Sequence, residues 1–171
     1  MNQEELLALL NQVDQKSIFF GPQGFEIFTT KSEIGKAQVG YGLDKHGQDL
    51  SGENEGDWHF SWLVIGRDTE LGDVYFIDLN NNDCPVFTAF KGESAWEVDP
   101  VATSLVGFIA CLRVLFKHGK QQGAVFVAEP NSIVDPILLK SLQSELIALS
   151  NNESFWTLFF NGYSGWLSEE Y

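Results

Sequence analysis

The start of the chain carries the pattern of an amphipathic helix. Asn2 followed by Glu5 matches a capping box, in which each side chain binds the backbone of the other residue. Apolar residues then recur every three or four positions, at Leu6, Leu7, Leu10 and Val13. We therefore predict a helix that runs to about Gln15 and covers one face of a sheet.

The middle of the chain consists of short apolar runs separated by turn residues, which is typical of β-strands. The runs that predict strands are residues 18–20, 25–29, 58–65, 74–79 and 85–90. A short helix is expected at residues 32–37. Residues 42–57 are rich in glycine and acidic residues and are expected to form a solvated loop.

One stretch, residues 63–79, organises these strands. Its first apolar run ends at Gly66, and Gly72 with Asp73 opens the second apolar run, which is the pattern of a hairpin. Residues 58–65 are largely apolar at both alternating sets of positions, so this strand should be central and covered on both faces. Because the connections are short, we expect a meander of three antiparallel strands.

Helix signals dominate the last third of the chain. Asp99 and Pro100 have the pattern of an N-cap and first helical residue, although Thr103 or Ser104 also fits the cap. An apolar stripe follows and Gly119 should end this helix.

Two further helices and one strand are expected after that. Residues 124–128 predict the strand. An Asp-Pro pair at 135–136 repeats the N-terminal signal, and the apolar pattern continues to Leu149. Residues 152–160 predict a short aromatic helix that the Asn-Gly pair at 161–162 ends.

These elements define an α+β fold: a single domain over residues 1–171, with a mainly antiparallel sheet, a central meander, and flanking N-terminal and C-terminal helices. The C-terminal helices form an extension from about residue 130 to residue 171. Cys84 and Cys111 are 27 positions apart and are expected to be free thiols.

The charge of the chain narrows its range of partners. It has 24 acidic and 10 basic residues, a net charge of −14. Phosphate binding needs clustered Lys and Arg, so neither nucleic acid nor an anionic membrane is expected as a ligand. Residues 44–99, here called the acidic segment, hold 13 acidic and three basic residues and so carry −10 of this charge.

Two negative features of the sequence concern location. No stretch offers about 18 consecutive uncharged apolar residues, and the N-terminus lacks the basic flank of a signal peptide. We expect a soluble, cytoplasmic protein.

No metal or cofactor motif is complete. Asp78, Asn80 and Asn82 imitate the start of an EF-hand loop, but the sixth position is Asp83 instead of Gly and the twelfth is Ala89 instead of Glu. An Asn-rich turn is the better interpretation. Three alternating acidic residues offer either a weak cation site or a solvated loop, and we favour the loop: Glu53, Glu55 and Asp57. No cofactor is expected.

One His and carboxylate pair remains as candidate catalytic chemistry. Asp57 and His59 would share a face if both lay on the predicted strand. No nucleophile motif such as GxSxG accompanies them, so a structural role is favoured over a small hydrolase, and we do not expect an enzyme.

Short motifs occur in a definite order between about residues 25 and 112. In chain order they are Trp62, Ile65, Gly66, Asp68, Gly72, Asp73, Asp78, Pro85, Val86 and Phe87, followed by the apolar stretch 102–112. In this order they resemble the SUKH superfamily, which includes yeast cell-wall-assembly regulators and many bacterial immunity proteins. The resemblance implies an α+β fold that acts by binding other proteins rather than by catalysis.

Charge and resemblance together lead to one functional expectation. The protein is expected to be a non-catalytic binding module, most specifically an immunity protein that neutralises a toxin with a basic surface, such as a nuclease. The expected partner-binding residues are Asp49, Glu53, Glu55, Asp57, Asp68, Glu70 and Asp73. The alternative is a regulatory or scaffold protein that docks a partner through exposed aromatic residues such as Trp58 or Trp166.

Overall fold

The computed structural model describes residues 1–168 and contains one six-stranded sheet flanked by helices. Each strand pairs with the next in antiparallel orientation, in the order β1-β2-β3-β4-β5-β6. The strands are β1 Ser17–Phe20, β2 Gln23–Ile27, β3 Trp62–Asp68, β4 Val74–Asp78, β5 Val86–Lys91 and β6 Trp96–Ala102. The helices are α1 Gln3–Leu10, α2 Lys31–Ala37, α3 Leu105–Gly119, α4 Pro136–Ser150 and α5 Glu153–Ser168. The predicted α+β fold is confirmed.

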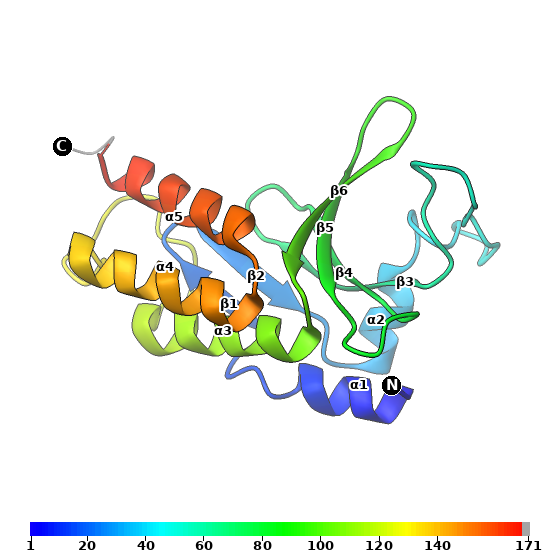
Figure 1. Ribbon diagram of the computed structural model, residues 1–171, viewed down its shortest axis with the longest axis horizontal. Coiled ribbons are helices and arrows are strands. Elements are labelled where there is room, and N and C mark those ends of the chain that lie inside the picture. The colour runs from blue at the N-terminus through cyan, green and yellow to red at the C-terminus, as the bar shows by residue number, and fades with distance from the viewer. Residues whose placement is uncertain (169–171) are drawn as a thin grey trace.

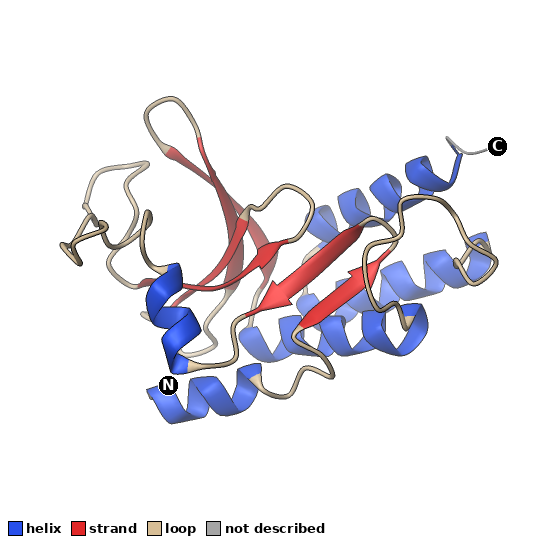
Figure 2. Cartoon of the chain, turned by 180° about the vertical axis from the view of Figure 1, so that it is seen from behind, coloured by secondary structure: helices blue, strands red, loops and turns tan. Residues whose placement is uncertain are grey.

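The two faces of the sheet have different covers (Figures 1 and 2). On the helix face, Ile65, Tyr75 and Ile77 belong to the main core together with buried residues of α3, α4 and α5. On the loop face, the alternate residues Val64 and Phe76 belong to a second cluster. This alternation follows from the two-residue period of a strand, and it confirms that β3 is central and covered on both faces.

The hairpin of β3 and β4 depends on two glycines. A Cβ atom on Gly66 would lie 2.5 Å from the Glu26 carbonyl oxygen of the neighbouring strand, so only glycine fits there without a shift. The register of β3 against β4 also shifts between Val64 and Gly66, which indicates a β-bulge. Gly72 has a φ of +82° in the connection, a conformation that favours glycine.

The predicted start of the first helix is confirmed in detail. Asn2 and Glu5 form the capping box of α1, but the helix ends at Leu10 instead of Gln15. There the Asn11 side-chain amide donates to the carbonyl oxygens of Leu7 and Thr29, which binds the chain to a distant segment. Within the described residues both cysteines are free, as expected, and both are buried.

The Asp99-Pro100 pair was misread as a helix start, and strand β6 was missed. Both residues lie in β6, which is the last strand of the sheet and pairs only with β5. Proline is tolerated there because an edge strand leaves some N–H groups without a partner strand. Ser104, the alternative cap, accepts a hydrogen bond from the Gly107 amide and begins α3.

Two predictions near the C-terminus are wrong. Residues 124–128 form no strand; they belong to a loop that the Val125 amide ties to the Gly21 carbonyl oxygen. Helix α5 does not end at residues 161–162 but continues to Ser168. It continues because Tyr163 still packs on Phe20, at 4.6 Å between ring centroids, so tertiary contacts outweigh the glycine.

Candidate functional site

The loop face of the sheet is covered by α2 and by residues 42–61, here called the covering loop. Its anchor is Trp58, whose side chain is 2% exposed. The Trp58 ring lies 4.8 Å from that of Phe76 and 5.3 Å from those of Trp62 and Trp96, between centroids. Trp58 therefore fixes the loop to the sheet and cannot dock a partner, contrary to the alternative that used it as an exposed aromatic.

One part of the covering loop, residues 53–57, brings acidic residues to one end of the sheet. The Trp96 amide donates to the Gly56 carbonyl oxygen at 2.8 Å, so residues 53–57 lie beside the β5–β6 connection. Val74 pairs with Ala89, which places the β3–β4 connection at the same end. Exposed acidic residues thus come from the covering loop, from the two connections and from the start of β6: Glu53, Glu55, Glu70, Glu93 and Glu97.

No ion pair within residues 1–168 uses an acidic residue of the acidic segment. The three ion pairs join Lys16 to Glu33, Arg67 to Glu26 and Arg113 to Asp14, and all three acids lie outside residues 44–99. Two of the segment's three basic residues contact other groups: Arg67 binds Glu26 at 2.5 Å, and Lys91 lies 5.8 Å from the Trp96 ring centroid. The negative charge of this region is therefore not compensated by the chain itself.

Asp49 and Asp57 shape the covering loop. The Asp49 carboxylate accepts hydrogen bonds from the Ser51 hydroxyl at 2.7 Å and the Ser51 amide at 2.8 Å, and these bonds lower its pKa. The Asp57 carboxylate accepts from the backbone and side-chain amides of Asn54 at 2.9 and 3.0 Å. Both acids hold turns while they contribute charge to the surface.

Asp68 is placed inside the fold. It is 4% exposed, and its carboxylate accepts hydrogen bonds from the Glu70 and Leu71 amides at 2.8 and 2.7 Å and from the Gln23 side chain at 2.7 Å. It supports the β3–β4 connection and offers no surface to a partner. Asp73 is half-buried, and partial burial together with the nearby Asp68 charge raises its pKa.

The remaining motif residues serve the hairpin and its core. Trp62 stacks near Phe76 on the loop face, at 4.7 Å between centroids, and Ile65 is fully buried on the helix face. The Asp78 carboxylate accepts from the Ser61 hydroxyl at 2.6 Å and the Asn80 amide at 3.0 Å. Packing and turn geometry are therefore enough to explain why Trp62, Ile65 and Asp78 stand at these positions.

Asp57 and His59 are not paired. Strand β3 begins at Trp62, so the prediction that both residues share a strand face is wrong. His59 Nδ1 lies 2.7 Å from Ser61 Oγ, whose proton is donated to Asp78. In a catalytic triad the histidine lies between the serine and the carboxylate, whereas here the serine is central and 4% exposed. The arrangement fixes the entry to β3.

No group of three or more His, Cys, Asp or Glu residues within residues 1–168 converges well enough to hold a metal ion. The acidic residues of the covering loop are spread along its length by their own turns. Their arrangement is suited to a broad electrostatic surface rather than to coordination.

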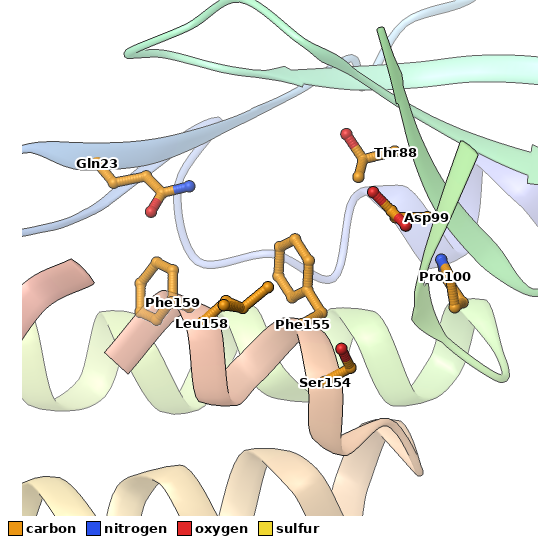
Figure 3. A pocket seen from close by; sticks show the side chains of 8 residues that line it. All are labelled: Gln23, Thr88, Asp99, Pro100, Ser154, Phe155, Leu158 and Phe159. Carbon is orange, nitrogen blue, oxygen red and sulfur yellow. The ribbon is translucent and has the colours of Figure 1, made fainter. Parts of the chain in front are cut away.

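A cavity of about 320 Å³ lies on the other side of the sheet, between α5 and the strands (Figure 3). Phe155 and Phe159 project from α5 towards the side formed by Gln23, Thr88 and Asp99. No pattern in the sequence predicted this cavity, because Asp99 and Pro100, which line it from β6, were expected to begin a helix. Trp166, also proposed as a docking residue, is half-buried and donates to the Phe126 carbonyl oxygen at 2.9 Å.

Comparison of the chain with protein-family models, with curated proteins and with solved structures finds no significant match. None of the helices within residues 1–168 has the length and apolar character to cross a membrane.

Proposed function

We propose that this protein is a non-catalytic binding module whose acidic segment recognises a basic protein, and that this partner is a toxin which it neutralises. The observation that carries the proposal is the uncompensated charge: residues 44–99 have a net charge of −10, and none of the three ion pairs within residues 1–168 uses their acids. Acidic side chains that form no ion pair within residues 1–168 keep their negative charge available to a partner.

The toxin part of the proposal has separate support. It rests on the resemblance of the ordered motifs around Trp62, Gly66 and Gly72 to the SUKH superfamily, many members of which are immunity proteins. A nuclease fits best among toxins because its phosphate-binding cleft is basic and complements an acidic surface. A complex of this kind would block the cleft without any chemical step.

The electrostatic part is tested by reversing charges that form no side-chain hydrogen bond or ion pair within residues 1–168. Glu53→Lys with Glu55→Lys should slow association with the partner at least tenfold and flatten the dependence of the association rate on salt. Asp57 is left unchanged because its carboxylate holds Asn54. Glu129→Lys with Glu145→Lys is the matched control, since these exposed acids give the same change in net charge outside the acidic segment.

The partner is sought among cytotoxic proteins encoded beside this gene. Co-expression of this chain should restore growth in cells that produce the toxin, the control variant should do the same, and the Glu53 and Glu55 variant should fail. Equal rescue by both variants, or salt-independent binding, would reject the charged surface and favour docking through apolar contacts.

A further inference from the structure

The cavity beside α5 continues into a longer groove. A second cavity of about 480 Å³ lies further along the same helix, and Gln23 and Phe159 line both cavities. The lining of α5 runs from Ser154 to Trp166, which is about 18 Å at the rise of an α-helix. An extended peptide of about five residues spans that length.

The floor of the groove is apolar and aromatic. Phe155, Phe159 and Tyr163 line it from α5; Phe155 is half-buried and the other two are largely buried, whereas Leu158 on the same helix is 69% exposed. At the far end Phe126 is 68% exposed. Large apolar side chains that remain open to solvent along a concave surface are typical of a protein interaction site.

Two glycines deepen the groove at a cost to the helix. Gly162 and Gly165 lie inside α5 and line the second cavity, and a Cβ atom added at either position would meet nothing within 4 Å. No close packing requires them, although each glycine weakens a helix interior by about 1 kcal/mol relative to alanine. Such local conflicts with helix propensity are expected where a surface serves a function.

The charge of the groove selects its occupant. The linings of the two cavities include Glu70 and Asp99 and contain no Lys or Arg. A second copy of this chain is disfavoured, because each copy carries a net charge of −14. Glu70 also belongs to the acidic end of the sheet, so the groove opens beside the surface that attracts a basic protein.

We propose that this groove receives an extended segment of the basic partner, with apolar side chains on the aromatic floor of α5 and a Lys or Arg side chain directed to Glu70 or Asp99. This inference rests on the proposed function and assigns a second role within it. The acidic segment accelerates the encounter, and the groove supplies the apolar contacts that hold the complex.

The test uses three labelled ten-residue peptides and the full chain. The first peptide combines lysines with leucine and phenylalanine, the second keeps the lysines but replaces the apolar residues by serine, and the third keeps the apolar residues but replaces lysine by glutamate. Only the first should bind well, at least tenfold more tightly than the others, with NMR chemical-shift changes concentrated in residues 154–166.

The groove is then filled without weakening the fold. Gly162→Leu places a side chain in the open space of the cavity and improves helix propensity, so it should fold at least as well as the natural chain and bind the first peptide at least tenfold more weakly. Gly35→Leu is the matched control, because Gly35 also lies in a helix with nothing within 4 Å of an added Cβ. It should change binding less than twofold.

The outcomes separate the two proposals. Three results would overturn the proposed binding role of the groove. The first is equal affinity of Gly162→Leu and Gly35→Leu for the first peptide, and the second is equal affinity of the natural chain for the serine or glutamate peptide. The third is a set of chemical-shift changes confined to residues 44–57. If the groove variant has no effect while Glu53→Lys with Glu55→Lys abolishes binding, the groove fails and the acidic surface stands. If no basic peptide or protein binds at all, both proposals fail.

Discussion

The two faces of the sheet are covered by different kinds of structure. The helix face is closed by three long helices, and residues 105–168 carry four acidic and four basic residues, so they are electrically neutral. The loop face is closed by one short helix and an irregular loop, whose cover depends on a small cluster around Trp58 and Phe76. The comparison teaches that core and charge are separated along the chain: the three helices supply much of the core and no net charge, whereas residues 44–99, which include the covering loop and the strand connections, hold −10 of the net charge.

This separation has a physical reason. Like charges repel within a compact state, so a charge of −10 in 56 residues opposes folding of the part that holds it. Trp58 and Trp62 offset this locally because aromatic side chains bury large apolar areas. Because a few large aromatic rings hold the covering loop on the sheet, acidic residues of the loop can remain exposed. A layer of helices at the same place would bury more of this surface.

The largest expected effect tests where stability resides. Phe108→Ala removes a fully buried ring from the helix face and should lower the free energy of unfolding by about 3–5 kcal/mol. Trp58→Ala should fall at the lower end of that range, because the covering loop can detach while the helix-face core persists. Urea denaturation measures the loss, and protease cleavage within residues 42–57 of folded Trp58→Ala reports detachment. Equal cleavage in both variants would contradict the separation.

The second-largest effect concerns the β3–β4 hairpin, whose alternating residues belong to the cores of both faces. Gly66→Ala should lower the free energy of unfolding by about 1–3 kcal/mol, because its Cβ would meet the Glu26 carbonyl oxygen at 2.5 Å. In Gly72→Ala the added Cβ meets no atom within 4 Å, and the only strain comes from the positive φ. This substitution should therefore lower the free energy of unfolding by about 1 kcal/mol. Thermal unfolding of the two variants distinguishes a steric clash at Gly66 from backbone strain at Gly72. A larger loss of stability in Gly72→Ala than in Gly66→Ala would contradict the close approach of β2 and β3 at Gly66.

A smaller effect tests a compensated acid. Lys16, assisted by backbone and side-chain hydrogen bonds from Thr29 and Thr30, holds the pKa of Glu33 at about 2, below its usual 4.5. This contribution to stability is present above pH 4.5 and is lost as the pH falls towards 2. Glu33→Gln should cost about 0.5–1 kcal/mol at pH 7, chiefly by weakening the capping box, and the difference from the natural chain should shrink between those pH values. A difference that is independent of pH would contradict the Lys16 contact.

The smallest effect tests an uncompensated acid and has the opposite sign. Partial burial and Asp68 raise the pKa of Asp73 above its usual 3.8, so its favourable contribution is present below that pH and is lost as the pH rises through the raised pKa. Asp73→Asn should therefore raise the free energy of unfolding at pH 7 by at most about 0.5 kcal/mol, after allowance for solvent screening. The gain should disappear in acid, as urea denaturation at several pH values will measure. A loss of stability at pH 7 would mean that the carboxylate is compensated.

Local patterns in the sequence determined the class of the fold and much of its detail. Three predicted features depend on residues close in the chain or on simple periodicity: the capping box at Asn2, the hairpin around Gly66 and Gly72, and the short helix before the covering loop. The charge imbalance is likewise a property of the sequence alone.

Long-range contacts decided the rest. Strand β6 forms despite Asp99 and Pro100 because it pairs at the edge of the sheet, and α5 passes through Gly162 because Tyr163 finds Phe20 across the molecule. Asp68 looked like a surface acid, but the folded chain buries it beneath its own turn and beside Gln23. The sequence by itself determined that the protein is acidic and where along the chain the charge lies. Only the tertiary structure decided which acids face solvent and that a groove opens beside them, because burial depends on residues far apart in the sequence.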